Sequence, residues 1–170
     1  MIDAARENYA DFLELIDEGY QLTWFHQKIA DKFQEAFEKL ERGESSKLII
    51  EMPPQHGKSQ EATIEFPAWA LGRHSEWPII TTSYSDELAT KFGFKTRDII
   101  DKPIYRKIFD TKIRQDSRAK GNWITEQGGG YLSAGIGGTI TGMGFKIGII
   151  DDPFKNRKEA ESKLMRNNVW

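Results

Sequence analysis

The run of residues 48–59, Leu-Ile-Ile-Glu-Met-Pro-Pro-Gln-His-Gly-Lys-Ser, constrains the fold more than any other stretch of this chain. Its apolar, β-branched beginning predicts a buried strand over about residues 47–52. Two prolines then end the strand, and Gly57, Lys58 and Ser59 follow. A strand that turns sharply into Gly-Lys-Ser is typical of a phosphate-binding loop. In such a loop backbone N–H groups surround the phosphates, the lysine reaches the terminal ones, and the serine hydroxyl ligates magnesium.

The loop departs from the common pattern G-x-x-x-x-G-K-[ST], because Met52 occupies the position of the first glycine. Pro53 and Pro54 can stiffen the loop where glycine would make it flexible. The residues after Ser59 can open a helix whose N-terminus would face the phosphates. The alternative is a tight surface turn with a solvated lysine, and Gly-Lys-Ser alone does not decide between the two.

A second run, Lys146–Ile150, predicts another apolar strand, and it ends in the adjacent carboxylates Asp151 and Asp152. Adjacent carboxylates repel each other, which indicates a cation nearby. The alternative is a turn, since aspartate and the following Pro153 both favour turns. A nucleoside triphosphate with its metal needs a phosphate loop and a carboxylate of this kind together.

The remaining pattern predicts helices over residues 4–18, 23–40, 59–71 and 85–100, with Thr23 and Ser85 as N-caps, Gly19 ending the first helix and Pro67 disturbing the third. A strand is expected over 78–84 and a hairpin over 123–126 and 131–134. Residues 104–120 are expected to be irregular or to hold a short helix, and the glycine-rich stretch 135–144 to be a mobile loop. Strands separated by helices predict an α/β fold with a mainly parallel sheet flanked by helices. Ligands of such sheets lie beyond the carboxyl ends of the strands, so Ser59 and Asp151 are expected to be neighbours.

Length and composition favour one soluble domain of 170 residues, with residues 1–44 as a helical lead-in. The chain has no cysteine and only three widely separated histidines, which excludes disulfides and thiolate zinc sites. It has no apolar run of membrane-spanning length and no basic signal-peptide region, so we expect an intracellular protein with no membrane partner.

Charge is distributed unevenly. Residues 1–44 hold 5 basic and 11 acidic side chains, whereas residues 91–120 hold 10 basic and 4 acidic ones. The basic block is suited to contact a nucleic-acid backbone. Interspersed lysines and arginines are also typical of an ordinary solvated face, and the sequence leaves both interpretations open.

Taken together, several motifs resemble the N-terminal ATPase region of the large terminase subunit of tailed bacteriophages, over about residues 22–170. These motifs are Pro53–Ser59, Phe66–His74, Thr82–Ala89, Gly129–Tyr131, Gly137–Gly142, Ile149–Pro153 and Lys155–Ser162. The resemblance implies a P-loop NTPase fold of the additional-strand, RecA-like type, with magnesium–ATP as substrate. It implies a motor that drives double-stranded DNA into a viral procapsid in the host cytoplasm. The implied partners are the portal protein, the small terminase subunit and further copies of the chain in a ring, although the chain in isolation is expected to be monomeric.

The resemblance also assigns roles to single residues. Lys58 matches the lysine that clamps the phosphates, Ser59 the metal-binding hydroxyl and Asp151 the Walker B carboxylate. Ser59 and Asp151 would together hold Mg²⁺. Asp152 stands where many such ATPases carry the glutamate that orients the attacking water. The nucleotide-binding positions are Pro54, Gln55, His56, Gly57, Lys58 and Ser59, with His26 and Gln27 as adenine contacts. A helix-start role for His26 and Gln27 is the alternative.

Two departures from the family pattern bear on the mechanism. Neither Gln55 nor Met143 is basic, so a catalytic arginine would have to come from elsewhere; Arg73, Arg118 and Arg157 are candidates. The carboxylate cluster of a nuclease is absent from this sequence, and we expect the chain to be an incomplete ATPase domain. A helicase-like DNA translocase fragment, or a nucleotide-binding module with little turnover, are the alternative functions.

Overall fold

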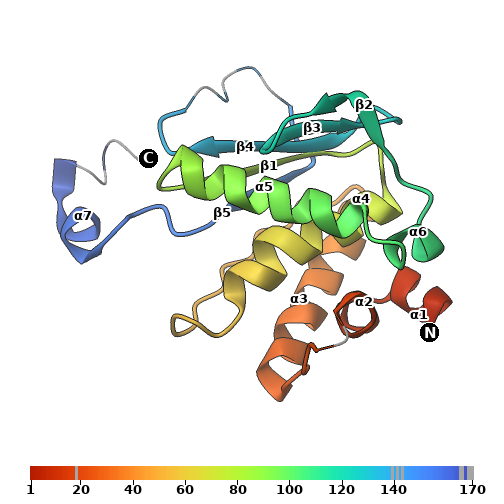
Figure 1. The fold of residues 1–170 in the computed structure, drawn as a ribbon. Coiled ribbons are helices and arrows are strands. Elements are labelled where there is room, and N and C mark those ends of the chain that lie inside the picture. Colours follow the sequence, from red (N-terminus) through yellow and green to blue (C-terminus); the bar gives the residue numbers. More distant parts are fainter. Residues whose placement is uncertain (18, 139, 141, 143, 165–166, 168–170) are drawn as a thin grey trace.

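The computed structural model describes residues 1–17, 19–138, 140, 142, 144–164 and 167. It consists of one five-stranded sheet and helices that gather mainly on one side of it (Figure 1). Thr139, Thr141 and Met143, which belong to the glycine-rich stretch, lie outside the described residues, as does Glu18 at the end of the first predicted helix.

The strands are β1 (Pro78–Ser83), β2 (Ile113–Arg118), β3 (Asn122–Thr125), β4 (Gly130–Gly135) and β5 (Ile147–Ile150). Their order in the sheet is β2-β3-β4-β1-β5. β1 pairs in parallel with β4 and β5, whereas β2, β3 and β4 pair antiparallel. The α/β class is therefore confirmed, but the sheet is mixed rather than mainly parallel, because the β3–β4 hairpin and β2 add two antiparallel pairs.

β1, β5 and the β3–β4 hairpin form where the sequence predicts strands. β2 lies in the stretch expected to be irregular, after the short helix α6 (Tyr105–Ile108). Its polar sequence, Ile-Arg-Gln-Asp-Ser-Arg, has little hydrophobic alternation, and only Ile113 is buried. Its side-chain pattern therefore does not predict a strand, and β2 forms because its backbone pairs with β3.

The strand predicted over residues 47–52 is wrong, since this segment has no strand pairing in the structure. β5 is an edge strand that pairs only with β1, so its outer side is the position at which this segment would have to pair. Ile49 is 86% exposed, and residues 45–48 and 50 line a cavity of about 490 Å³ together with residues 145–151. An apolar, β-branched segment thus lies near β5 without forming a ladder with it.

The lead-in forms α1 (Ile2–Glu7), α2 (Tyr9–Ile16) and α3 (Trp24–Glu41). The single helix predicted over residues 4–18 is divided at Asn8, whose extended backbone ends α1 and whose side chain accepts a hydrogen bond from the Asp11 N–H to cap α2. α2 ends at Ile16, before Gly19. The predicted N-cap of α3, Thr23, is confirmed.

The helix after the loop begins as a π-helical turn, η1 (Gln60–Glu65), and continues as α4 (Phe66–Arg73). The Phe66 N–H bonds to the Glu61 carbonyl, five residues back. Pro67 has no N–H to offer the Thr63 carbonyl, and the hydroxyl of Tyr131 on β4 donates to that carbonyl instead, at 3.1 Å. The predicted disturbance at Pro67 is thus accommodated by a side chain from the sheet.

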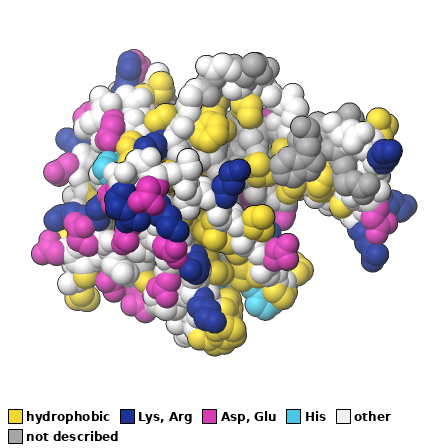
Figure 2. All heavy atoms as spheres, turned by 180° about the vertical axis from the view of Figure 1, so that it is seen from behind, with side chains coloured by type: hydrophobic (Ala, Val, Ile, Leu, Met, Phe, Trp, Pro, Cys, Tyr) yellow, Lys and Arg dark blue, Asp and Glu magenta, His cyan; other side chains and the backbone are white. Residues whose placement is uncertain are grey.

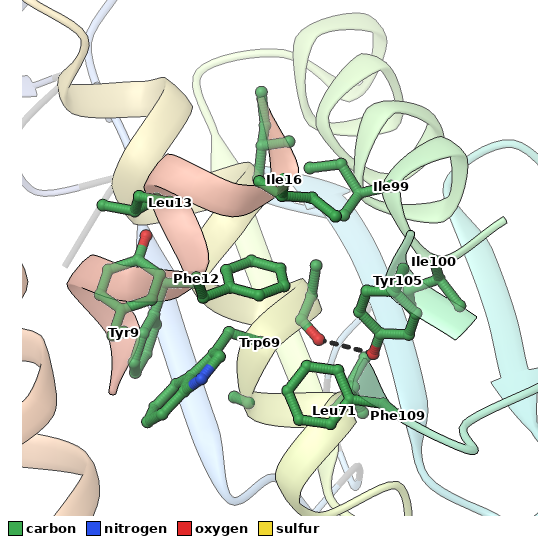
Figure 3. Packing of buried hydrophobic residues seen from close by; sticks show 14 of the residues in the cluster. Tyr9, Phe12, Leu13, Ile16, Trp69, Leu71, Ile99, Ile100, Tyr105 and Phe109 are labelled. Carbon is green, nitrogen blue, oxygen red and sulfur yellow. Dashed lines mark hydrogen bonds between the residues drawn. The ribbon is translucent and has the colours of Figure 1, made fainter. Parts of the chain in front are cut away.

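The lead-in and α4 share one aromatic core (Figure 3). The Tyr9 ring contacts Phe33, Phe66 and Trp69, and Trp69 Nε1 donates to the Ala5 carbonyl at 3.1 Å. On the other side of α4, the Tyr105 hydroxyl donates to the Ala68 carbonyl at 2.8 Å. The helix that follows the loop is therefore held from both sides.

α5 (Asp86–Ile100) packs on β1 and β4 (Figure 1), and the predicted cap Ser85 accepts from the Leu88 N–H at 3.3 Å. The short helix α7 (Arg157–Glu161) lies at the far end of the molecule from α1 (Figure 1). Within the described ranges, none of the helices combines the length and apolar character needed to cross a bilayer.

Candidate phosphate and metal site

The two carboxylates follow β5 at the carboxyl edge of the parallel strands. The Asp151 N–H donates to the Thr82 carbonyl at 2.9 Å, and the Tyr84 N–H donates to the Asp152 carbonyl at 3.2 Å, so β1 fixes both residues. Asp152 has a φ of 44°, in the left-handed region that aspartate tolerates better than most residues. The chain therefore turns at Asp152 directly after the ladder ends.

Residues 53–59 form a tight turn that leads into η1. Gln55 and Gly57 have positive φ values of 64° and 83°. The ring of His56 bonds the Pro54 carbonyl through Nδ1 at 2.8 Å, and the Gly57 carbonyl accepts the Glu61 N–H at 3.0 Å. The turn thus ends in a helix N-terminus, the arrangement that a phosphate-binding loop requires.

Lys58 and the two carboxylates converge, although 93 and 94 positions separate them in the sequence. Lys58 Nζ donates to Asp152 Oδ1 at 2.8 Å and lies 3.8 Å from Asp151 Oδ1. The Asp151 side chain is 5% exposed, whereas those of Lys58 and Asp152 are 27% and 57% exposed. The structure therefore brings together one half-buried cation, one buried carboxylate and one exposed carboxylate.

Burial raises the pKa of Asp151 above its usual range, and the charge of Asp152 raises it further, whereas the Ser59 hydroxyl and the Lys58 ammonium act in the opposite direction. Partial burial lowers the pKa of Lys58, but the hydrogen bond and charge of Asp152 outweigh it, so that the net pKa shift is upward. The lysine therefore carries its positive charge at neutral pH, and this charge favours the ionised form of the buried Asp151 carboxylate beside it.

The oxygen atoms at this edge fit a magnesium ion. Asp151 Oδ2 is buried and has no hydrogen-bond partner, and the same is true of the hydroxyl of Ser83 at the end of β1, the strand that pairs with β5. Carboxylate and hydroxyl oxygens are the ligands that Mg²⁺ prefers, and it usually binds through one or two carboxylates together with substrate phosphates. Among the described residues no group of three or more histidine or acidic side chains is placed to hold a metal ion by itself.

His26 and Gln27, the two predicted adenine contacts, lie in the first turn of α3. The His26 ring reaches the loop, with Nε2 3.1 Å from the His56 carbonyl oxygen, whereas Gln27 Nε2 donates to Asp31 Oδ1 at 2.8 Å. Contact of either residue with adenine stays a prediction. Glu61 and Tyr20 were not predicted from the sequence to be site residues. Glu61 Oε1 lies 3.6 Å from His26 Nε2, and the Tyr20 hydroxyl donates to the same oxygen. The sequence did contain one signal for Glu61: it is a carboxylate two residues after the Gly-Lys-Ser motif, in a helix that is expected to be buried.

The candidate arginines are all engaged within the chain. Arg73 pairs with Glu7 and Glu41, Arg118 with Asp101, and Arg157 with Glu161. The side chain of Arg157 is 90% exposed, in contrast to those of Arg73 and Arg118, which are 19% and 32% exposed. Of the three, Arg157 is therefore the one best placed to reach another molecule.

The basic block of residues 91–120 is partly neutralised. Arg106 and Arg118 pair with Asp101, and Arg114 pairs with Asp116. Arg97 and Lys102 donate to backbone carbonyls. The exposed Lys91 and Lys120 have no ion pair within the described part of the chain, and they line one surface cavity of about 520 Å³ with Tyr84 and Phe94. On the rear face, too, side chains of both signs are interspersed (Figure 2).

The fold and the site define an α/β protein with a lysine-bearing turn opposite a pair of strand-end carboxylates. Residues 49–170 match the family model described as "Terminase large subunit, T4likevirus-type, N-terminal". The chain therefore belongs to the terminase large subunit family, which supports a role in DNA packaging. A search of curated proteins and a search of solved structures found no match.

Proposed function

We propose that this chain carries the magnesium-dependent ATPase site of a terminase large subunit, and that hydrolysis powers the translocation of double-stranded DNA into a viral procapsid. The observation that carries the proposal is the convergence of Lys58 Nζ with the carboxylates of Asp151 and Asp152, at 3.8 Å and 2.8 Å. A P-loop NTPase fold of the additional-strand type would explain this geometry, because it places the phosphate loop and the Walker B carboxylate at one edge of a sheet.

Each of the three side chains has a role that its position suits. Lys58 neutralises the negative charge of the terminal phosphates, which is mainly an electrostatic contribution. Ser59 and the buried Asp151 would hold Mg²⁺, which would supply neutralisation of phosphate charge. Asp152 is exposed and orients a water molecule for attack on the γ-phosphorus, which breaks the bond to the β–γ bridging oxygen and releases ADP and phosphate. The loop residues Pro54, Gln55, His56 and Gly57 would surround the phosphates with backbone groups.

Asp152 and Lys58 bind each other in the structure, so the phosphates must compete with Asp152 for the lysine. Binding of ATP would then release the Asp152 carboxylate at the moment when a water must be positioned. This exchange couples occupation of the site to the availability of its base.

DNA, the portal protein, the small terminase subunit and neighbouring copies in a ring are the proposed partners, in the host cytoplasm. The exposed Arg157 is our candidate for insertion into a neighbour's site, where such an arginine contributes about a thousandfold or more to the rate. The arginine would first have to leave Glu161.

ATP hydrolysis measured with and without double-stranded DNA tests the proposal. Lys58→Ala should abolish turnover while leaving the circular dichroism spectrum unchanged. Lys39→Ala is the matched control, because Lys39 also pairs with a carboxylate, Glu35, but lies on α3 away from the site. Near-normal turnover by Lys58→Ala would remove this lysine from the mechanism. Binding of ATP without hydrolysis under any condition would favour the nucleotide-binding module, and stimulation by single-stranded rather than double-stranded DNA would favour a helicase-like translocase.

A further inference from the structure

One side chain of the lead-in is bonded to the loop itself. The His26 ring lies between the first turn of α3 and the turn at residues 53–59, with Nε2 3.1 Å from the carbonyl oxygen of His56. The contact joins positions 30 residues apart. It is made to the backbone immediately before Gly57 and Lys58.

The N-cap of α3 determines which ring nitrogen carries the proton. The Thr23 N–H donates to His26 Nδ1 at 3.4 Å, and the Thr23 hydroxyl lies 3.0 Å from the same nitrogen. Nδ1 must therefore act as an acceptor, and in the neutral ring the proton is on Nε2. Nε2–H is then a donor directed at the His56 carbonyl. One ring caps the helix with one nitrogen and holds the loop with the other.

Buried groups keep the ring in this place. Glu61 is fully buried, its Oε1 lies 3.6 Å from His26 Nε2, and the Tyr20 hydroxyl donates to the same oxygen. A Cβ built on Gly57 would lie 3.3 Å from Nε2, so the loop backbone passes close to the ring at a residue with a φ of 83°. The ring is thus confined between the loop and a buried carboxylate.

We infer that His26 is a positioning residue for the phosphate loop, and that it contributes to nucleotide binding through the phosphates rather than through the base. The inference rests on the proposed function. A loop whose carbonyl at position 56 is already hydrogen-bonded to His26 loses less conformational freedom when it wraps a phosphate chain, and preorganisation of this kind increases affinity. The effect should be the same for any ligand that carries the triphosphate, with or without adenine.

Two substitutions at this position test the contact with the loop. In His26→Asn the amide oxygen can replace Nδ1 as the acceptor for Thr23, but no donor reaches the loop. In His26→Gln the amide nitrogen can replace Nε2 as the donor to His56, and glutamine at the third residue of α3 completes a Thr-x-x-Gln capping box. We expect His26→Asn to bind the triphosphate more weakly and His26→Gln to bind it nearly normally, both with little change in Tm.

The measurement is calorimetric titration of the whole chain with Mg–ATP and with Mg–tripolyphosphate. His26→Asn should lower the affinity for both ligands by the same factor, about tenfold. This factor corresponds to ~1.4 kcal/mol, the size of one net hydrogen bond. Glu65→Gln is the control, because Glu65 is a buried carboxylate at the end of η1 that accepts a hydrogen bond from Gln60, outside residues 53–59, and both affinities should stay unchanged.

Two results would overturn the inference. If His26→Asn weakens Mg–ATP but binds Mg–tripolyphosphate as the unaltered chain does, His26 acts on the adenine. If both ligands bind the variant normally, the contact with His56 has no bearing on binding. Failure of the proposed function looks different, because the unaltered chain itself would then bind neither ligand, and the inference would fall with it.

Discussion

Glu65 lies at the end of η1 with only 1% of its surface exposed, and its chemistry makes a sharp prediction about stability. Burial raises the pKa of this carboxyl to about 7, and the hydrogen bond from Gln60 opposes the shift. The charges of Glu61 and Asp17 raise the pKa further, and Lys102 lowers it. Oε1 accepts from Gln60 Nε2 at 2.9 Å, but Oε2 has no partner.

The sign of the pH dependence follows from proton binding. The folded chain holds the Glu65 proton up to about pH 7, whereas the unfolded chain releases it near pH 4.5. The contribution of Glu65 to stability is therefore fully present below pH 4.5 and is lost as the pH rises to 7. A pKa difference of about 2.5 corresponds to roughly 3 kcal/mol in total, of which about 2.5 kcal/mol is lost between pH 5 and pH 8.

Glu65→Gln removes this pH-dependent term. Its amide keeps an acceptor for Gln60, but it places an N–H where Oε2 has no partner, at a cost of about 1–2 kcal/mol at every pH. We expect the variant to be about as stable as the unaltered chain, or less, at pH 5 and more stable at pH 8. At about 2–4 °C per kcal/mol for a chain of this size, the difference in Tm between variant and unaltered chain should change by roughly 5–10 °C across this range.

Thermal unfolding followed by circular dichroism at pH 5, 6, 7 and 8 measures this difference. The control is Glu35→Gln on α3, where the carboxyl is exposed and its pKa is lowered to about 2 by hydrogen bonds from Lys32 and Lys39. That variant should gain nothing at pH 8. Parallel Tm curves for Glu65→Gln and the unaltered chain would refute the argument, because they would show that Glu65 does not take up a proton on folding.

Two further predictions concern the proposed motor. Asp152→Asn removes the ion pair with Lys58, which contributes at most about 1 kcal/mol because the Asp152 carboxylate is exposed. ATP should therefore bind up to about fivefold more tightly, while hydrolysis in a single turnover is lost. Undiminished cleavage would exclude a role for Asp152. The double variant Lys91→Ala, Lys120→Ala should weaken binding of double-stranded DNA and reduce its log–log salt dependence by about 1.8, as two lost phosphate contacts require. Arg114→Ala, which only releases Asp116, should change that slope little, and an unchanged slope in the double variant would remove these lysines from the DNA interface.

Much of this fold was predictable from local signals. The β-branched runs that form β1 and β5 are flanked by breakers, Ser85 caps α5, and glycines separate β3 from β4, so each of these elements forms where its own residues favour it. The Gly-Lys-Ser turn and the two strand-end carboxylates were predictable for the same reason. Their separation of more than 90 residues does not matter, because parallel strands end at one edge of a sheet.

The failures occur where a partner from elsewhere in the chain decides. Residues 47–52 have the composition of a strand but form no ladder with the nearby edge strand β5, whereas the polar β2 is a strand because β3 offers it hydrogen bonds. The contact of His26 with the loop depends on how α3 docks, and the neutralisation of Arg118 depends on where Asp101 lies.

The sequence by itself indicated most of the helices and turns of this protein and the side chains proposed to carry its chemistry, since these follow from residues within a few positions of each other. Only the tertiary structure decided which segments pair, which charges are cancelled and what holds the loop. Hydrogen bonds and ion pairs between distant segments exist only after the aromatic core has brought those segments together.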